Sequence, residues 1–318
     1  MKHLSGIQPS GSLHLGNYFG AIRQHLDSQD ENSAYFIANY HALTSLHDAK
    51  ALEQYTLEVA ATYLALGLDP HKCLFFKQSD VPEVTELCFI LSTVTGMGLL
   101  QRGHAYKDKV ENGLPASLGL FSYPVLMAAD ILIFDTQFVP VGGDQIQHVE
   151  IASDIAGSFN AAVGQDILVK PSFKVSPVTK VLGLDGQKMS KSYHNTIPIF
   201  SNDYGKYVSK IKTDGADFRT KPLTVDGDVT FHLLSLFLTP TEQEAMRVSY
   251  LEDRAFGYGH AKKILIQKLE STFGEAQRKF DDLMAHPNTI KLQLDVGGRK
   301  AREIAQRKMK VVREVLGI

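Results

Sequence analysis

Two short segments of the chain carry residue types that could bind phosphate groups. The first, residues 6–17, reads Gly-Ile-Gln-Pro-Ser-Gly-Ser-Leu-His-Leu-Gly-Asn and follows a short strand candidate. Glycines in a strand-to-helix turn let a phosphate approach the backbone, and a helix N-terminus supplies N–H donors and a positive dipole end. The spacing matches neither a dinucleotide G-x-G-x-x-G loop nor a Walker loop. Alone, the segment is equally compatible with an ordinary tight turn that contains a histidine.

The second segment, residues 186–192, reads Gly-Gln-Lys-Met-Ser-Lys-Ser. Its two lysines lie three residues apart, with serines between and after them. This pattern suits a polyphosphate, because a lysine is a mobile positive charge and a serine hydroxyl donates hydrogen bonds. Composition alone nevertheless favours a solvated linker between two domains.

Two other places combine polar and apolar residues in a way that could select a ligand. Asp130 interrupts an otherwise apolar helix candidate, and an unpaired buried carboxylate is costly, so this side chain needs a partner. It could cap a neighbouring turn, pair with a lysine or bind a ligand. Gly142-Gly143-Asp144 ends a strand candidate, where glycine permits close approach and an aspartate can accept hydrogen bonds from ribose hydroxyls.

The elements that must position these residues alternate between strand and helix over the first two-thirds of the chain. The sequence predicts strands at residues 2–7, 34–38, 73–77 and 138–141, and helices at 15–26, 48–66 (with Asp48 as N-cap), from 80 and at 144–159. This alternation predicts an α/β fold, a Rossmann-type doubly wound parallel sheet. After about residue 196, helices are predicted at 203–212, 229–238, 241–251, 258–273 and 294–316. The sequence therefore also predicts a C-terminal all-helical domain.

Composition limits the function less than the segments do. The 318 residues are 44% hydrophobic, enough for a large core, and the net charge is −2. Residues 256–318 contain 13 lysines and arginines but seven acidic residues, which hints at a polyanionic partner. No stretch suits a membrane span and no apolar leader is visible, so we expect a cytoplasmic protein. Cys73 and Cys88 lack metal-ligand spacing, so we expect no zinc and no iron–sulfur cluster.

Taken together, the two phosphate-suited segments resemble the signatures of class I aminoacyl-tRNA synthetases, the H-x-G-N motif and the K-M-S-K-S loop. Three further segments are similar to those of tryptophanyl-tRNA synthetases of the bacterial type. They are residues 6–11, residues 123–132 (Tyr-Pro-Val-Leu-Met-Ala-Ala-Asp-Ile-Leu) and residues 139–150 (Val-Pro-Val-Gly-Gly-Asp-Gln-Ile-Gln-His-Val-Glu). The likeness runs from Gly6 to about Pro198 and implies three domains: a Rossmann catalytic domain at 1–195, an anticodon-binding helical domain at 196–292, and a final helix at 293–318 that packs back toward the first.

The resemblance also implies roles for residues. His14, Asn17, Lys188 and Lys191 are the catalytic candidates: the first two would hold ATP phosphates, and the lysines would stabilise charge on the α-phosphate and the leaving pyrophosphate. The ATP-binding set comprises Gln8, Pro9, Ser10, Gly16, Asn17, Lys109, Gly142, Gly143, Asp144, Val181, Lys188, Met189, Ser190, Lys191 and Ser192. A solvated surface run is nearly as compatible with the segment around Lys109.

For the amino acid, the resemblance makes Asp130 the acceptor of an indole N–H. Met127, Val139 and Val141 would line the ring, although each could be plain core. Tyr123, Gln145 and His41 are candidates for the polar end of the substrate.

The implied reaction joins tryptophan to its tRNA, tRNA(Trp), with ATP as its Mg²⁺ complex, in a homodimer. A tyrosyl-tRNA synthetase is the nearest alternative, because an aspartate can also accept a phenol O–H. A synthetase-like binding or regulatory protein is the alternative from another class.

Overall fold

The computed structural model describes residues 1–102, 116–175, 180–215 and 222–318, with the side chain of Asp144 outside that description. The chain divides into two compact units, each made from separate stretches of sequence. Unit 1 comprises Met1–Ser12, His25–Pro177 and Leu283–Ile318, and unit 2 comprises Leu13–Gln24 and Val178–Asp282.

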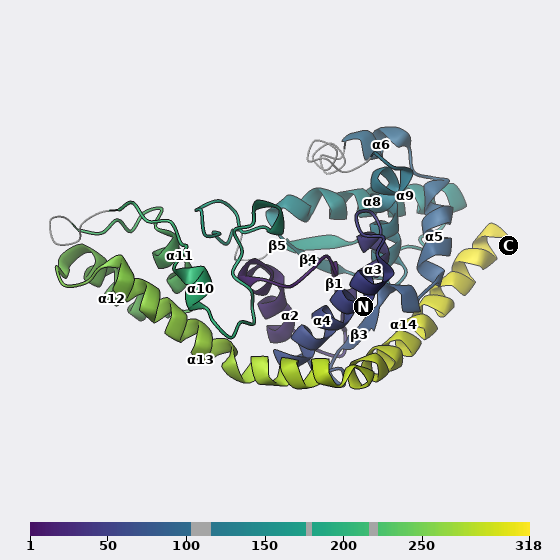
Figure 1. The fold of residues 1–318 in the computed structure, drawn as a ribbon. Helices are drawn as coiled ribbons and strands as arrows, with labels where there is room; N and C mark the ends of the chain where they lie inside the picture. Colours follow the sequence, from purple (N-terminus) through teal and green to yellow (C-terminus); the bar gives the residue numbers. More distant parts are fainter. Residues whose placement is uncertain (103–115, 176–179, 216–221) are drawn as a thin grey trace. The chain divides into compact units, whose positions relative to one another are not determined.

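Unit 1 is built on a five-stranded parallel sheet (Figure 1). Its strands are β1 (His3–Ile7), β2 (Ser33–Ile37), β3 (Leu74–Lys77), β4 (Phe138–Val141) and β5 (Ser172–Val175), in the spatial order β3-β2-β1-β4-β5. β1 and β2 pair from His3 opposite Ser33 to Ile7 opposite Ile37. The strand order reverses between β1 and β4, which is the point where doubly wound sheets bind ligands at the carboxyl ends of their strands. The predicted α/β fold class is therefore confirmed.

Helices of unit 1 cover the sheet and complete its core. They are α2 (Arg23–Asp27, at the boundary with unit 2), α3 (Asn39–Ala42), α4 (Ala49–Ala65), α5 (Glu83–Ser92), α6 (Met97–Arg102), α8 (Leu118–Leu132), α9 (Ile146–Val163) and α14 (Pro287–Leu316), with the 3-10 turns η2 (Gln78–Asp80) and η3 (Gly143–Gln145). Asp48 caps α4 as predicted, because its carboxylate accepts the Ala51 N–H. The core joins side chains of β2, β3, α5, α8, α9 and α14 into one apolar cluster.

Unit 2 contains two short stretches from the start of the chain, α1 (Leu15–Asn17) and the π-helical turn η1 (Tyr18–Ile22). Its remaining elements are η4 (Lys191–Tyr193), α10 (Gly205–Val208), α11 (Val229–Ser235), α12 (Pro240–Glu252) and nearly all of α13 (Tyr258–Ala285). Tyr18, Phe19, Phe237 and Phe273 form a run of edge-to-face ring contacts that ties the early stretch to the late helices.

The helices of this region depart from the predicted bounds in length. α10 covers only four of the ten residues predicted at 203–212, whereas α13 continues 12 residues past the predicted end at Phe273. The two units interleave along the sequence, whereas the ranges 1–195, 196–292 and 293–318 are contiguous, so those ranges stay a proposal about functional domains. Among the described residues, no helix has both the length and the apolar character of a membrane span.

The last helix, α14, lies along the edge strand β3 and also contacts α4 and α5 (Figure 1). The approach is closest at Gly297, where an added Cβ would lie 1.7 Å from the backbone oxygen of Phe75 in β3. The next residue, Gly298, is similarly close to the side chain of Asp80. Only glycine allows such a backbone contact, and by lying there α14 covers an edge that would otherwise be open to pairing with another strand.

We expect Gly297→Ala to lower the free energy of unfolding by about 3 kcal/mol or more, because the new methyl group would overlap a backbone atom and α14 must move off β3. Urea unfolding followed by circular dichroism measures the change. Gly274→Ala is the matched control, since an added Cβ in the middle of α13 meets no atom within 4 Å. That change should be neutral or stabilise by up to about 1 kcal/mol. Equal effects of the two variants would contradict the tight contact.

Candidate active site

The carboxylate of Asp130 lies at the centre of a buried polar network in unit 1. Asp130 is near the end of α8 and is 2% exposed. His41 Nε2, from α3, lies 2.9 Å from Asp130 Oδ2. Gln78 Nε2, at the end of β3, donates to both carboxylate oxygens, at 2.9 Å to Oδ1 and 2.8 Å to Oδ2. Three elements far apart in sequence therefore meet at this one side chain.

Burial raises the pKa of Asp130, because a desolvated carboxylate is less stable than a solvated one. The hydrogen bonds from His41 and Gln78 act in the opposite direction, since both donors stabilise the ionised form. The arrangement is that of an acceptor held ready in an apolar site. Among the described residues, the partners of Asp130 are therefore His41 and Gln78 rather than a lysine, and its role as acceptor of a ring N–H stays a prediction.

Other predicted residues lie around this network. The Tyr123 hydroxyl is 2.7 Å from His148 Nε2, and the Tyr123 ring packs edge-on against His41 with 6.2 Å between ring centroids. Gln8 donates from Nε2 to the backbone oxygen of His41 at 3.1 Å. Met127, Val139 and Val141 belong to the apolar core of unit 1 or pack against it, and Gln145 is exposed. The structure thus brings Gln8, His41, Tyr123 and Asp130 together and leaves Gln145 on the surface.

The first phosphate-suited segment enters unit 2 at Leu13, and the next residue, His14, is the N-cap of α1. The His14 N–H donates to Asn17 Oδ1 at 3.0 Å, which fixes the turn between them. Backbone hydrogen bonds tie this turn to the strand-like stretch that follows the second segment: Leu15 N donates to Ile197 O at 2.9 Å, and Ile199 N donates to Leu13 O at 3.1 Å. The two signatures are therefore neighbours within one unit, although about 175 residues separate them.

Electrostatics keeps His14 neutral. Burial, and secondly the positive charge of Lys191, lower the pKa of His14 to about 4. A neutral imidazole can donate one hydrogen bond to a phosphate oxygen without carrying charge. Gly16 makes room for the ring, because a Cβ there would lie 2.9 Å from His14 and 3.5 Å from Met189 Cβ. His14, Asn17, Gly16 and Met189 are thus brought together, with Lys191 near enough to influence the histidine.

The second segment is a tight hairpin. Gly183 N donates to Gln187 O at 2.8 Å and Met189 N donates to Val181 O at 2.8 Å, so residues 181–183 pair with 187–189. Gly186 takes a φ of +85° in the turn, a conformation that favours glycine. Met189 and Val181 are buried, whereas Lys188 and Ser192 are exposed and Ser190 and Lys191 are half-buried. The hairpin therefore anchors on its apolar residues and leaves its cations toward solvent.

Asn195, buried to 2% exposure, holds this hairpin together. Its amide Nδ2 donates to Asp185 Oδ1 at 2.7 Å and to Lys188 O at 3.2 Å, while its Oδ1 accepts from Ser190 N at 2.8 Å. These bonds fix the backbone on both sides of the lysine pair. The bond from Asn195 is also the main cause that lowers the pKa of Asp185.

For the reaction that the sequence resemblance implies, we expect Asn195→Ala to slow ATP–pyrophosphate exchange by about 10-fold or more, because a loosened hairpin no longer holds Lys188 and Lys191 in one geometry. Steady-state exchange kinetics with saturating substrates measures this. Gln277→Ala is the control, since Gln277 makes comparable side-chain bonds, to Ser201 N and Asn202, away from the hairpin. Full exchange activity in Asn195→Ala would show that the hairpin orders itself without this residue.

The ribose candidates follow β4 in unit 1, where Gly142 caps the turn η3. A Cβ at Gly143 would meet no atom within 4 Å, so this position could accept a larger residue without displacing its neighbours. The side chain of Asp144 and the whole of Lys109 lie outside the described residues. Pro9 is buried and Ser10 is exposed, just after β1.

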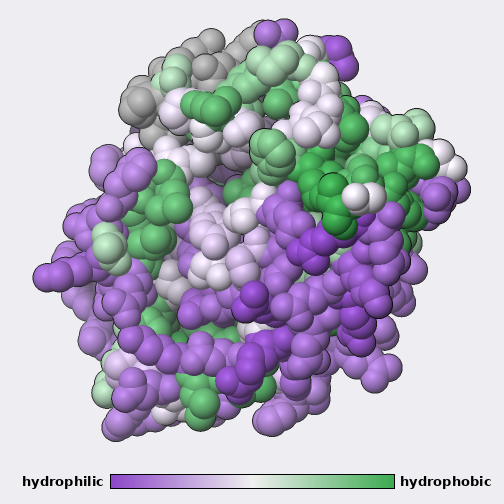
Figure 2. Space-filling view, turned by 90° about the vertical axis from the view of Figure 1, so that its right-hand side faces the viewer, coloured by the Kyte–Doolittle hydropathy of each residue, from purple (hydrophilic) through white to green (hydrophobic). Residues whose placement is uncertain are grey.

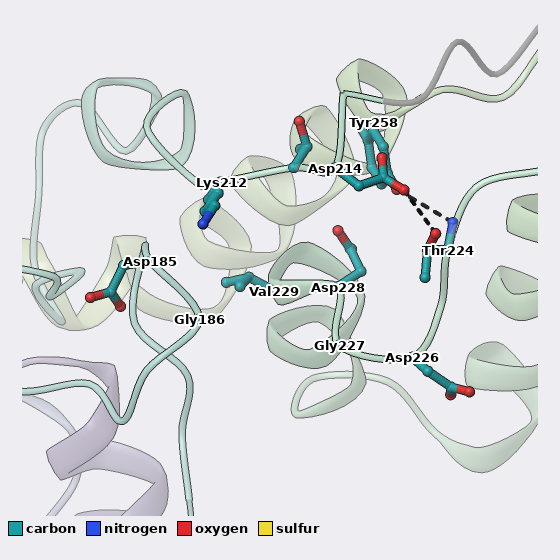
Figure 3. Close-up of a pocket in the computed structure, with 11 residues that line it drawn as sticks. Asp185, Gly186, Lys212, Asp214, Thr224, Asp226, Gly227, Asp228, Val229 and Tyr258 are labelled. Atoms are coloured by element: carbon teal, nitrogen blue, oxygen red, sulfur yellow. Dashed lines mark hydrogen bonds between the residues drawn. The ribbon is translucent and has the colours of Figure 1, made fainter.

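Unit 2 also contains a pocket of about 290 Å³ that the sequence did not indicate (Figure 3). Four aspartates, one lysine and a tyrosine are among its lining residues: Asp185, Asp214, Asp226, Asp228, Lys212 and Tyr258. Two of the acids have internal partners, since Asp214 accepts from Thr224 Oγ1 and Asp228 accepts from Phe231 N and Tyr250. In the described part of the chain, no group of three or more potential ligands is arranged to hold a metal ion.

Comparison with known proteins places this architecture in a family. The model of the tRNA synthetases class I (W and Y) matches residues 1–274. The chain belongs to this family and is an aminoacyl-tRNA synthetase, a ligase.

Relatives point to one member of the family. The chain is similar to the tryptophan–tRNA ligase of Campylobacter jejuni strain RM1221, at 50% identity over 322 residues and 100% of both chains. It is also similar to that of Rhodopirellula baltica, at 47% identity and 96% of both. Among solved structures, the C. jejuni tryptophanyl-tRNA synthetase complexed with ADP and tryptophan superimposes with a TM-score of 0.92 at 50% identity over 100% of both chains. The enzyme of Mycoplasma pneumoniae gives 0.83 at 27% identity, over 100% of this chain and 97% of that one.

The sequence analysis did not identify three residues that hold the Asp130 network or the lysine hairpin in place: Gln78, His148 and Asn195. Gln78 had a usable signal, because it is a polar residue directly after a buried strand of a parallel sheet, where ligand sites form. His148 lies within a segment already noted for its resemblance. Asn195 carried no signal apart from its position just after the lysine pair.

Proposed function

We propose that the chain is a tryptophan–tRNA ligase, which activates tryptophan with MgATP and transfers it to tRNA(Trp) in the cytoplasm. The observation that supports the amino acid most directly is the buried Asp130 carboxylate, held as a hydrogen-bond acceptor by His41 and Gln78. An indole N–H donor matches such an acceptor. The full-length similarity to tryptophan–tRNA ligases supports the same assignment.

In the first step the tryptophan carboxylate attacks the α-phosphorus of ATP, and pyrophosphate leaves. No protein side chain forms a covalent bond in this step. Lys188 and Lys191 stabilise the negative charge that develops on the α-phosphate and on the leaving group. Neutral His14 donates to a phosphate oxygen, and Asn17 fixes the turn that carries it.

In the second step a hydroxyl of the terminal tRNA ribose attacks the carbonyl carbon of tryptophanyl-adenylate, and AMP leaves. Charging of tRNA(Trp) with radiolabelled tryptophan, compared with tyrosine on its own tRNA, tests the whole reaction. Acid-precipitable label with tryptophan alone is expected. Label with tyrosine alone would replace the proposal by a tyrosine–tRNA ligase, and adenylate formation without any charging would favour a synthetase-like regulatory protein.

A homodimer is part of the same proposal. Phe89, Met97 and Leu118 are 73%, 61% and 79% exposed on α5, α6 and α8. Hydrophobic surface gathers in the upper half of Figure 2, at the height of these helices in Figure 1. Exposed apolar surface of this kind is typical of a subunit interface. A second copy of the chain is the proposed occupant, and sedimentation velocity measures the resulting mass.

The cations of the basic C-terminal helix α14 differ in whether they have an acidic partner; Lys291, Arg302, Lys308, Lys310 and Arg313 each have one. Lys308 bonds Asp135 at 2.5 Å and Arg313 bonds Glu86 at 2.5 Å, so these two hold α14 against the other elements of unit 1. Arg299, Lys300 and Arg307 are exposed and form none of the ion pairs found between described residues. We assign these three cations to tRNA phosphates.

Replacing Arg299, Lys300 and Arg307 with Gln should weaken tRNA charging and reduce the slope of binding against salt by up to about three units, because each lost phosphate contact removes roughly one. ATP–pyrophosphate exchange should not change, since it needs no tRNA. Filter binding at several salt concentrations gives the slope. Unchanged charging and an unchanged slope would mean that these three cations only form a solvent-exposed face of the helix.

A further inference from the structure

The side chain of Gln78 uses both ends of its amide beside the Asp130 carboxylate. Gln78 is 1% exposed, and its side chain makes four hydrogen bonds. Its Oε1 accepts from the backbone N–H of Tyr40 at 2.9 Å and of His41 at 3.4 Å. Its Nε2 donates to both oxygens of Asp130. The Gln78 side chain therefore connects the start of α3 to the end of α8.

The orientation of this amide is fixed by its neighbours. Two backbone N–H groups can only face an acceptor, so the oxygen of Gln78 must point to α3 and its nitrogen must point to Asp130. A flipped amide would place donors against donors on one side and an oxygen against a carboxylate on the other. Because no rotation satisfies the network in another way, Asp130 always meets a donor at this position.

The hydrogen bonds from His41 and Gln78 do not occupy every lone-pair position of the Asp130 carboxylate. A carboxylate has about four lone-pair positions. Oδ2 accepts from both His41 and Gln78, whereas Oδ1 accepts from Gln78 alone among the described residues. One lone-pair position on Oδ1 thus has no donor among the described residues. Without the amide, the buried carboxyl would have one donor, His41, and would more readily hold a proton of its own.

We propose that Gln78 is a positioning residue that makes the site selective for a substrate ring bearing an N–H donor. This inference rests on the proposed function, in which Asp130 receives that donor. Gln78 acts by keeping Asp130 a pure acceptor with its free lone pair on Oδ1. A ring of the same shape without the N–H then leaves a buried acceptor unpaired and is rejected.

The test compares kcat/KM for ATP–pyrophosphate exchange with tryptophan and with β-(3-benzothienyl)alanine, in which sulfur replaces the ring N–H. The wild-type enzyme should prefer tryptophan by at least about 10-fold. Gln78→Met keeps the length of the side chain and removes all its hydrogen bonds. In this variant we expect the ratio to fall to within about threefold of one, mainly through loss of activity with tryptophan.

Gln29→Met is the matched control. Gln29 also joins separate segments through its amide, donating to Leu26 O and Gly67 O and accepting from Asp69 N, but it has no contact with Asp130. Its ratio should stay at the wild-type value even if its Tm falls. Gln78→Glu covers the case that Gln78→Met does not fold, because it keeps the acceptor for α3. The new carboxyl must share one proton with Asp130. Because Asp130 is then no longer a pure acceptor, the ratio of kcat/KM values should fall in this variant too.

Two outcomes would overturn the inference in different ways. If both folded Gln78 variants keep the wild-type ratio and lose activity equally with the two substrates, Gln78 is only structural, while the contact of Asp130 with substrate stands. If the wild-type enzyme itself uses both substrates equally, the contact proposed for Asp130 is wrong, and the role of Gln78 is overturned with it.

Discussion

Lys191→Ala is expected to lower the rate of adenylate formation by about 10²–10³ while the Kd for tryptophan changes less than about threefold. The lysine is proposed to act only where charge develops on the α-phosphate and pyrophosphate, so its loss affects the transition state more than the ground state. Lys191 is half-buried beside the buried His14, and its charge there is strong enough to help lower the pKa of that histidine. Single-turnover kinetics with equilibrium binding separates the two quantities.

The control for this prediction is Lys263→Ala, an exposed lysine of α13 in the same unit. It removes one positive charge from the surface and should leave the rate within about twofold of wild type. A loss that appears wholly as weaker tryptophan binding in Lys191→Ala, at an unchanged rate, would show that the assigned role is wrong. Lys188→Ala should behave like Lys191→Ala.

Asp130→Asn is expected to lower kcat/KM for tryptophan by about 10² or more and to leave the KM for ATP nearly unchanged. The change removes a charged hydrogen bond to the substrate, which contributes roughly 1.5–3 kcal/mol. It also places an amide among the buried donors of His41 and Gln78, where no orientation satisfies every group. Exchange kinetics with each substrate varied in turn measures both effects.

The same acceptor predicts strong rejection of phenylalanine by the wild-type enzyme, about 10⁴ or more in kcat/KM, because the carboxylate would be left unpaired. In Asp130→Asn this discrimination should shrink. Equal losses for tryptophan and ATP would instead mean that Asp130 only maintains the fold around α3, β3 and α8.

The strands that carry the site could be predicted because β2, β3 and β4 are largely apolar runs between turn residues, and β1 leads directly into a glycine-containing turn. β5 is absent from the prediction although Ser172–Val175 alternates polar and apolar side chains; all four residues are exposed, so no buried face marks the strand. It joins the sheet only because the backbone of β4 offers hydrogen bonds at that edge. The prediction for the long helix α13 is too short, because after Phe273 half of its residues are polar and none is buried, so no buried apolar stripe continues the helical pattern.

Some residues of the candidate site could be predicted from local sequence, and others could be identified only from their contacts in space. His14, Lys188, Lys191 and Asp130 stand in short segments whose residue types already suggest phosphate or ligand chemistry. Gln78 and Asn195 gain their roles only from partners in space, and Gln78 is 52 residues from the aspartate that it orients. The basic tail shows the limit of composition: the charge count indicated a polyanion, yet Lys308 and Arg313 are used within unit 1.

ATP–pyrophosphate exchange measured with each of the twenty amino acids tests the central claim most directly. The assay reports the first step alone, so it needs neither tRNA nor knowledge of how tRNA binds. We predict exchange with tryptophan that exceeds exchange with every other amino acid by orders of magnitude. Strong exchange with tyrosine and none with tryptophan would contradict both the assignment and the role given to Asp130.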